Sequence, residues 1–256
     1  MESIAVPAPK YYRLLPYWAV LQTDLRQTLR SWAYRLWLTV SLVMAIGYLL
    51  YRFGLHHEAG LMQSASIHTS DVLRGLVLGS MALIVVLTVS SISSERGTLA
   101  DSVLSRGISR YQYYMAKWHA RTFAILATFL VLAGTILIGS HVLLSEDVTF
   151  TGGLVAVAMV GLLLVPVVAW GVAISALTNS TALGVTILWV VLYGVGFVMP
   201  LIPSSYPSPE HIFERLPHVL RGYYDLAALG DQAGICGGLA GLAGIVGLVG
   251  FVRKDV

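Results

Sequence analysis

Charged residues are scarce in this sequence. Its 256 residues include only 16 Lys and Arg and 13 Asp and Glu, 11% of the chain, whereas 57% are hydrophobic. A soluble domain carries roughly 25% charged residues, so these few could not cover a water-facing surface of this size. A soluble globular fold is excluded, and lipid is expected to be the solvent for most of the surface.

Cysteine and the motifs of soluble enzymes are lacking as well. The single Cys236 rules out an intrachain disulfide and a cysteine metal site. No G-x-x-x-x-G-K-[ST] loop occurs, so no ATP site is expected on this chain. His57 and Glu58 could begin a zinc-protease box, but Leu61 stands where the second histidine is required. We expect no catalytic residue, metal or cofactor on the chain, and a net charge of +3 is too small to indicate nucleic-acid binding.

Long apolar runs, by contrast, are abundant. A membrane-spanning helix needs about 20 largely apolar residues, and six such runs can be placed. They lie near residues 34–51, 72–94, 118–140, 152–178, 181–203 and 232–252. The predicted fold is an all-α integral membrane bundle of six helices, forming a single transmembrane domain over residues 1–256.

The interiors of these runs carry almost no charge. No charged residue lies between Arg35 and Arg52 or between Asp147 and Glu210, and Arg121 is placed at the end of a run. Ion-coupled carriers usually hold an ionisable residue at mid-membrane. If the chain transports a solute, the energy is therefore expected from outside the membrane domain.

The Lys and Arg distribution predicts the orientation. An even number of spans places both termini on one side, and cytoplasmic termini put twelve basic residues inside and four outside. The twelve are Lys10, Arg13, Arg26, Arg30, Arg35, Arg96, Arg106, Arg110, Lys117, Arg121, Arg253 and Lys254; the four are Arg52, Arg74, Arg215 and Arg221. The chain is expected to be a multi-pass protein of the cell (inner) membrane, whose first span is not a cleaved signal peptide.

Residues 16–32 predict an amphipathic helix ahead of the first span. Apolar side chains recur every three or four positions, between Trp18 and Trp32, with polar residues such as Asp24 and Arg26 in between. A basic polar face and tryptophans suit the cytoplasmic headgroup layer, surrounded by membrane lipid. The alternative is a helix that packs on another protein domain, and both can hold.

The connection at 95–117 is the most informative segment. Thr98 can cap a helix of about two turns that Gly107 ends. Leu99, Val103 and Leu104 form one apolar edge of that helix. No lipid requires an apolar edge in a cytoplasmic loop, so we expect it to fit a protein groove.

A new helix is predicted to begin at Arg110. Ser109 and Gln112 form an S-x-x-Q capping box, and Ile108 and Tyr113 are placed to form the hydrophobic staple. If the helix continues to about residue 140 it is ~46 Å long, against a hydrocarbon core of ~30 Å. The third span is therefore expected to project into the cytoplasm and to form a stiff bracket with the short helix.

This connection resembles that of type-2 ABC exporter permeases, including the Nos-type branch. The resemblance is carried by Glu95-Arg96-Gly97-Thr98-Leu99, Leu104-Ser105, Ile108-Ser109-Arg110 and Lys117, and it extends to the six-span plan. Gly107 departs from it, because the family usually has proline there.

The resemblance implies a division of labour between subunits. The short helix would be a coupling helix that docks on a separate ABC ATPase subunit, where ATP and Mg²⁺ bind, and two permeases, identical or paralogous, would pair as a dimer to form the substrate pathway. The residues implied in ATPase coupling are Glu95, Gly97, Thr98, Leu99, Val103, Leu104, Ser105, Ser109, Arg110 and Lys117.

Other functions remain open at this point. A self-contained membrane channel or secondary carrier is the alternative, with a generic loop at 95–117. A pathway lined by apolar residues with Ser, Thr, Tyr and Asn suits an amphiphile, lipid, peptide or drug better than a small ion.

The outer segment 204–231 predicts a further helix. Ser208 and Pro209 form an N-cap and N1 pair. Ile212 and Leu216 belong to its apolar face, and Pro217 is expected to kink or split it. The resemblance implies paired re-entrant helices here, whereas physical chemistry alone equally allows a helix lying flat on the membrane.

Overall fold

The described part of the chain is all-helical. The computed structural model describes residues 14–59, 64–95, 108–144, 147–198 and 208–253, and no strand occurs among them. The helices are α1 (Leu15–Arg30), α2 (Trp32–Ala59), α3 (Ala65–Ser93), α5 (Arg110–Leu144), α6 (Phe150–Leu177), α7 (Thr181–Val198), α8 (Pro209–Leu220) and α9 (Leu226–Arg253).

Six of these helices, α2, α3, α5, α6, α7 and α9, are long and apolar enough to cross a membrane. They coincide with the six predicted runs, which are therefore confirmed as helices. α5 begins at Arg110, as the capping box predicts. The predicted end of the fifth run, at 199–203, lies outside the described residues.

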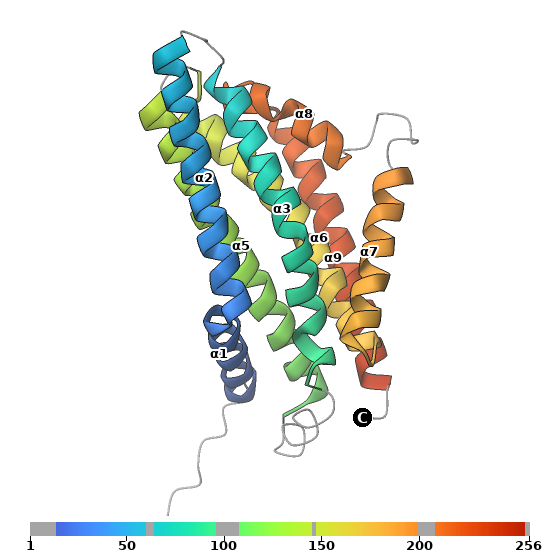
Figure 1. The fold of residues 1–256 in the computed structure, drawn as a ribbon. Helices are drawn as coiled ribbons and strands as arrows, with labels where there is room; N and C mark the ends of the chain where they lie inside the picture. The colour runs from blue at the N-terminus through green and yellow to red at the C-terminus, as the bar shows by residue number, and fades with distance from the viewer. Residues whose placement is uncertain (1–13, 60–63, 96–107, 145–146, 199–207, 254–256) are drawn as a thin grey trace, which may run out of the picture.

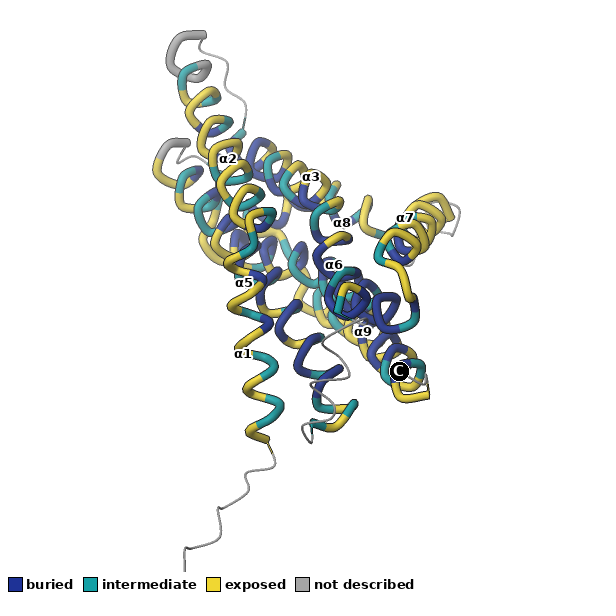
Figure 2. Tube along the Cα trace, turned by 60° about the horizontal axis from the view of Figure 1, so that its bottom comes forward, coloured by how far each residue is buried: buried dark blue, intermediate teal, exposed yellow. Residues whose placement is uncertain are grey.

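α6 is the centre of the bundle. It contacts α3, α5, α7, α8 and α9, and it contributes fully buried residues such as Val160 and Val168 to the main hydrophobic core. α7 lies at the edge, where only Gly184 and Leu188 are buried. Figure 2 shows the contrast, with α6 mostly buried and both α2 and α7 mostly exposed. Their exposed surface is apolar, as expected where lipid is the solvent.

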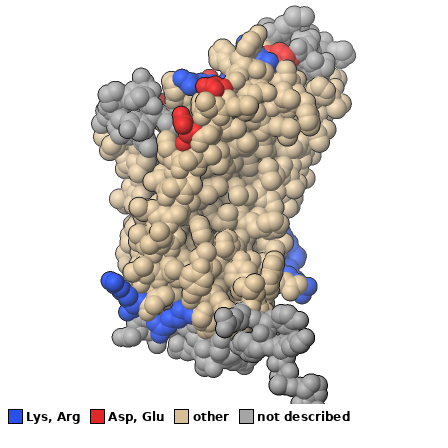
Figure 3. Space-filling view, turned by 180° about the vertical axis from the view of Figure 1, so that it is seen from behind, with Lys and Arg blue, Asp and Glu red and all other residues tan. Residues whose placement is uncertain are grey.

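The two ends of the bundle differ in their charges. α1 and the last turn of α9 lie at one end, here called the α1 end, and α8 lies at the other, the α8 end (Figure 1). On the face in Figure 3, Lys and Arg gather at the α1 end, and charges of both signs gather at the α8 end. A broad uncharged band separates them, as the six apolar runs require.

α8 covers the core at its own end. The Ser208 hydroxyl accepts a hydrogen bond from the backbone N–H of His211 at 3.2 Å, so the predicted cap is confirmed. Ile212, Leu216 and Leu220 are buried in the main core against α6 and α3. The expectation that Pro217 splits the helix is wrong. α8 runs unbroken to Leu220, because proline removes one backbone hydrogen bond and the buried Leu216 and Leu220 hold the turn on both sides of it against the core.

Hydrogen bonds to Asp147 connect helices at the α8 end. The Asp147 carboxylate accepts hydrogen bonds from the Ser66 backbone N–H at 2.9 Å, the Ser66 hydroxyl at 2.7 Å and Arg221 Nε at 3.0 Å. Burial opposes ionisation of this carboxyl, but the Ser66 hydrogen bonds and the Arg221 charge outweigh burial and lower the pKa of Asp147. Asp147 thus joins the start of α3 to the end of α8.

The glycines of α9 divide into two sets. A Cβ at Gly247 would lie against the Tyr114 hydroxyl and 2.8 Å from Ala173 Cα, so this glycine allows close contact with α5 and α6. A Cβ at Gly234, Gly237, Gly238 or Gly241 would meet nothing within 4 Å. Only the set nearer the α1 end therefore serves helix contacts within the described chain.

Candidate functional site

The end of α3, which leads into residues 96–107, is anchored to two other helices. The Ser175 hydroxyl of α6 accepts hydrogen bonds from the backbone N–H groups of Ile92 and Ser93, both at 2.9 Å. The Ser93 hydroxyl lies 2.8 Å from that of Thr181, the first residue of α7. The last turn of α3 is therefore bound to both α6 and α7.

Glu95, the last described residue before residues 96–107, is bound to α5. Its Oε1 lies 2.6 Å from Lys117 Nζ, and its Oε2 accepts a hydrogen bond from the Tyr113 hydroxyl at 2.6 Å. Charge-assisted hydrogen bonds of this length are the strong ones. The two oxygens thus fix the Glu95 side chain against consecutive turns of one helix.

Lys117 also reaches across to α1. Its Nζ lies 2.7 Å from Asp24 Oδ1, and Arg121 Nη2 lies 3.2 Å from the same oxygen. We call Asp24, Glu95, Tyr113, Lys117 and Arg121 the ion cluster. Its two cations and two anions balance, and the Lys117 and Asp24 side chains are only 4% and 1% exposed. Buried ions persist in proteins when they are paired in this way.

The orientation of α1 follows from the ion cluster. Asp24 and Thr28, one turn apart, are the buried residues of α1 and face α5. Trp18 and Leu29 are 60% and 40% exposed on other sides of the helix. A helix is present at Leu15–Arg30, close to the predicted 16–32, and its amphipathic character stays a prediction. Asp24, assigned to the polar face of that helix, is buried, because the α5 cations draw this carboxylate inward. Whether α1 lies at a membrane surface stays a prediction.

Arg121, predicted to lie at a span end, is buried in the ion cluster, with 8% of its surface exposed. Two features of the sequence pointed to the ion cluster: Asp24 is the only acid between Glu2 and Glu58, and Lys117 and Arg121 are four residues apart on one helix face.

The start of α5, which follows residues 96–107 in the sequence, is also held by hydrogen bonds. The Ser109 hydroxyl accepts from the Gln112 N–H at 3.1 Å, and Gln112 Oε1 accepts from the Ser109 N–H at 3.3 Å, so the capping box is confirmed. Ile108 packs against the cluster that contains Tyr113, as the staple predicts. Arg110 Nη1 donates to the Val252 carbonyl at 3.0 Å, which ties this turn to the end of α9.

The predicted coupling residues divide between described and undescribed parts of the chain. Glu95, Ser109, Arg110 and Lys117 all lie at the α1 end, and Glu95 and Lys117 are in direct contact. The predicted short helix is not among the described residues. Gly97, Thr98, Leu99, Val103, Leu104 and Ser105 lie outside them.

The ion cluster connects helices through ion pairs and hydrogen bonds. Its polar groups bind mostly one another; among its fully buried side-chain atoms in the described chain, Asp24 Oδ2 and Arg121 Nε have no hydrogen-bond partner. No group of three His, Cys, Asp or Glu residues that could hold a metal occurs among the residues described. The arrangement positions α1, α3 and α5 relative to one another.

Comparisons with protein-family models and with curated proteins find no match. The six apolar helices are those of a multi-pass integral membrane protein.

Proposed function

We propose that the chain is the transmembrane permease subunit of an ATP-driven ABC exporter. It would pair with a second permease copy or a paralogue, and a separate ATPase subunit that binds ATP and Mg²⁺ would drive the pair. The observation that carries the proposal is the ion cluster, since it binds both flanks of residues 96–107 to each other and to α1. A segment that receives force from a partner needs such an attachment.

The distribution of charge supports the same orientation. Basic residues at the α1 end suit the cytoplasmic side, where an ATPase would be found. The described residues that flank 96–107 lie at that end, where Glu95 on one side and Tyr113 on the other are in hydrogen-bond contact. The resemblance of 95–117 to the coupling loop of type-2 permeases agrees with this placement.

The ion cluster suggests how movement would be transmitted. A push on residues 96–107 would reach Glu95, and through Lys117 it would reach α5 and Asp24 of α1. Removing one partner of a buried ion pair costs about 3–5 kcal/mol, so small forces would not separate these helices. α1, α3 and α5 would therefore move together, and the start of α7 would follow them through the contact between Ser93 and Thr181.

The decisive experiment replaces two leucines of the predicted coupling helix. The chain is purified gently from its native membrane, co-purifying proteins are identified by mass spectrometry, and ATP hydrolysis is measured. We expect a stoichiometric ATPase subunit with the native chain. In a Leu99→Ala, Leu104→Ala variant we expect loss of that subunit or of transport-coupled hydrolysis, because the apolar contacts with the partner are removed.

A matched control makes the same two leucine-to-alanine substitutions at the α8 end of the bundle. Leu154 and Leu226 are 53% and 64% exposed, towards the α8 end. The Leu154→Ala, Leu226→Ala variant is expected to retain the ATPase. Unchanged coupling in the first variant would contradict the assignment of 96–107.

A secondary carrier is a second candidate, and one observation favours it. Lys117 and Arg121 are ionisable groups inside a long apolar helix, and such residues mark ion-coupled transport in other membrane proteins. Transport by the pure chain in vesicles, driven by an ion gradient without nucleotide, would support the carrier and exclude the exporter.

A further inference from the structure

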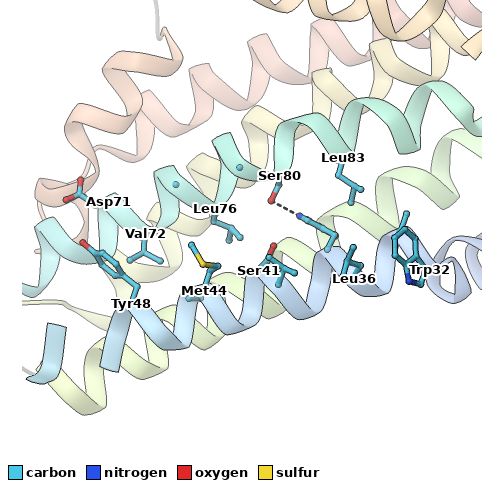
Figure 4. A pocket seen from close by; sticks show the side chains of 16 residues that line it. Trp32, Leu36, Ser41, Met44, Tyr48, Asp71, Val72, Leu76, Ser80 and Leu83 are labelled. Atoms are coloured by element: carbon cyan, nitrogen blue, oxygen red, sulfur yellow. Dashed lines mark hydrogen bonds between the residues drawn. The ribbon is translucent and has the colours of Figure 1, made fainter. Parts of the chain in front are cut away.

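A groove runs between α2 and α3 on the exposed side of the bundle. Its volume is about 700 Å³, within the range of small-molecule sites. It is lined from Trp32 to Tyr48 on α2 and from Asp71 to Leu83 on α3 (Figure 4). The lined part of α3 is about 18 Å long at 1.5 Å per residue. That length is close to the ~15 Å depth of one leaflet's hydrocarbon.

Glycines open the groove on the α3 side. Gly75 and Gly79 lie one turn apart in its lining, and a Cβ at either position would meet nothing within 4 Å. Trp37 Nε1 donates to the Ser80 hydroxyl at 3.0 Å, so one of the few polar atoms within the groove is already bound. The middle of the groove therefore offers hydrocarbon surface to a ligand.

The two ends of the groove differ in polarity. In Figure 4, Asp71 and Tyr48 lie at one end, towards α8, and Trp32 lies at the other. The Tyr48 hydroxyl accepts hydrogen bonds from Arg52 Nε and Nη2, both at 3.3 Å. The Asp71 carboxylate is exposed and forms no ion pair within the described chain. The exposed carboxylate of Asp71 thus stands at the same end of the apolar groove as the Arg52 guanidinium, which is bound to Tyr48.

The lining suits a long thin ligand with a cationic head. Val40 and Met44 in the groove lining are 50% and 69% exposed, so the groove opens sideways to the surrounding lipid. A hydrocarbon chain can enter by that side without crossing water. Its head would then reach Asp71, where charge complementarity selects an ammonium group over a carboxylate.

We propose that the groove between α2 and α3 binds a single-chain amphiphile with an ammonium head, its chain along Gly75 and Gly79 and its head at Asp71. As the site from which a substrate is taken up, it rests on the proposed function. As a binding site, it stands without it.

The test uses photolabelling of the full chain in phosphatidylcholine nanodiscs. The probe is a hexadecylamine with a diazirine in its chain, and adducts are mapped by mass spectrometry. We expect saturable labelling within 32–48 and 71–83 that unlabelled hexadecylamine displaces. The corresponding hexadecanol probe is expected to bind about fivefold more weakly, the upper range for one exposed ion pair.

Variants test binding of the ligand's hydrocarbon chain and of its ammonium head separately. Gly79→Leu fills the groove and is expected to abolish saturable labelling. Gly47→Leu is its matched control, because Gly47 is also open but lies outside the lining. Asp71→Asn is expected to remove the preference for the amine over the alcohol, and Asp231→Asn, at an exposed position of α9, is expected to keep it.

Three results would overturn the proposal. The first is unsaturable labelling spread over all lipid-facing helices, and the second is equal labelling in the Gly79→Leu variant. The third is cross-linking of two chains through groove residues that shuts out the probe, which would make a second copy the occupant. The assay contains no ATPase or nucleotide. If labelling is saturable but no ATPase co-purifies with the native chain, the binding site stands and the exporter is refuted. If an ATPase co-purifies but labelling is not saturable, the exporter stands and the binding site is refuted.

Discussion

At the residue scale, Lys117 is the charge that joins the two carboxylates of the ion cluster. Its ammonium group lies 2.7 Å from Asp24 and 2.6 Å from Glu95, and 5.6 Å from the centre of the Tyr113 ring. Two carboxylates from α1 and from the end of α3 share it as a counter-ion. Since both would otherwise be buried near one another with only Arg121 for compensation, Lys117 decides whether the ion cluster can form.

Replacing this lysine should therefore be costly. The variant Lys117→Met keeps the length of the side chain and removes its charge, so we expect the free energy of unfolding to fall by about 3–5 kcal/mol. The measurement is unfolding by a denaturing detergent, followed by circular dichroism. Addition of Asp24→Asn should recover part of the loss, because one uncompensated carboxylate is then removed.

Arg26→Met serves as the control for this change. Arg26 is exposed on α1, and its removal should change the free energy of unfolding by less than about 1 kcal/mol. If Lys117→Met proved as mild as Arg26→Met, the ion cluster would contribute no net stabilisation.

At the element scale, helix contacts depend on where small residues fall. α9 contacts α5 and α6, and Gly247 lies where Tyr114 and Ala173 come closest to it. Tyr113 and Tyr114 both pack near Phe251, so this part of α9 supports the turn of α5 that carries the ion cluster. The close approach at Gly247 leaves no room for a Cβ.

Two glycine substitutions on α9 test this arrangement. Gly247→Ala should destabilise the protein by about 1–3 kcal/mol, as expected for overpacking against Ala173. Gly241→Ala meets no neighbour and should be neutral or stabilising by up to about 1 kcal/mol, because alanine favours helix. Thermal unfolding of the two purified variants measures the difference. Equal effects would contradict the packing of α9 described above.

At the scale of the whole molecule, the helices alone establish that both ends of the described chain lie together. α1 and the last turn of α9 are at one end of the bundle, which agrees with an even number of spans. The asymmetry of charge between the ends then predicts which one faces the cytoplasm. The proposed function requires the α1 end to be cytoplasmic.

Labelling of single cysteines checks this orientation. With Cys236→Ala as background, Glu210→Cys on α8 should react with an impermeant maleimide in intact cells. Gln27→Cys on α1 should react only after permeabilisation. Both positions are exposed, so access to the reagent depends on the side of the membrane. The reverse pattern would exclude an ATPase bound at the α1 end from the cytoplasm.

Much of the fold was predictable from the sequence, because the relevant physics is local. The six apolar runs match six helices, since burial of a helix in lipid depends on about 20 consecutive residues. The Ser109 and Ser208 caps were also predictable, because a cap involves residues within one turn. Of the kink or split expected at Pro217, the split was wrong, since the packing of Leu216 and Leu220 against the core depends on other helices.

The sequence by itself thus determined where the six apolar helices of the described chain lie and where two of its helices are capped. Only the tertiary structure decided which faces meet: Asp24 and Lys117 are 93 residues apart, and the groove of Gly75 and Gly79 needs two helices to exist. The physical reason is one of range. Backbone hydrogen bonds and transfer to lipid are set by residues close in the chain, whereas ion pairing and cavities depend on distances in space that no local pattern specifies.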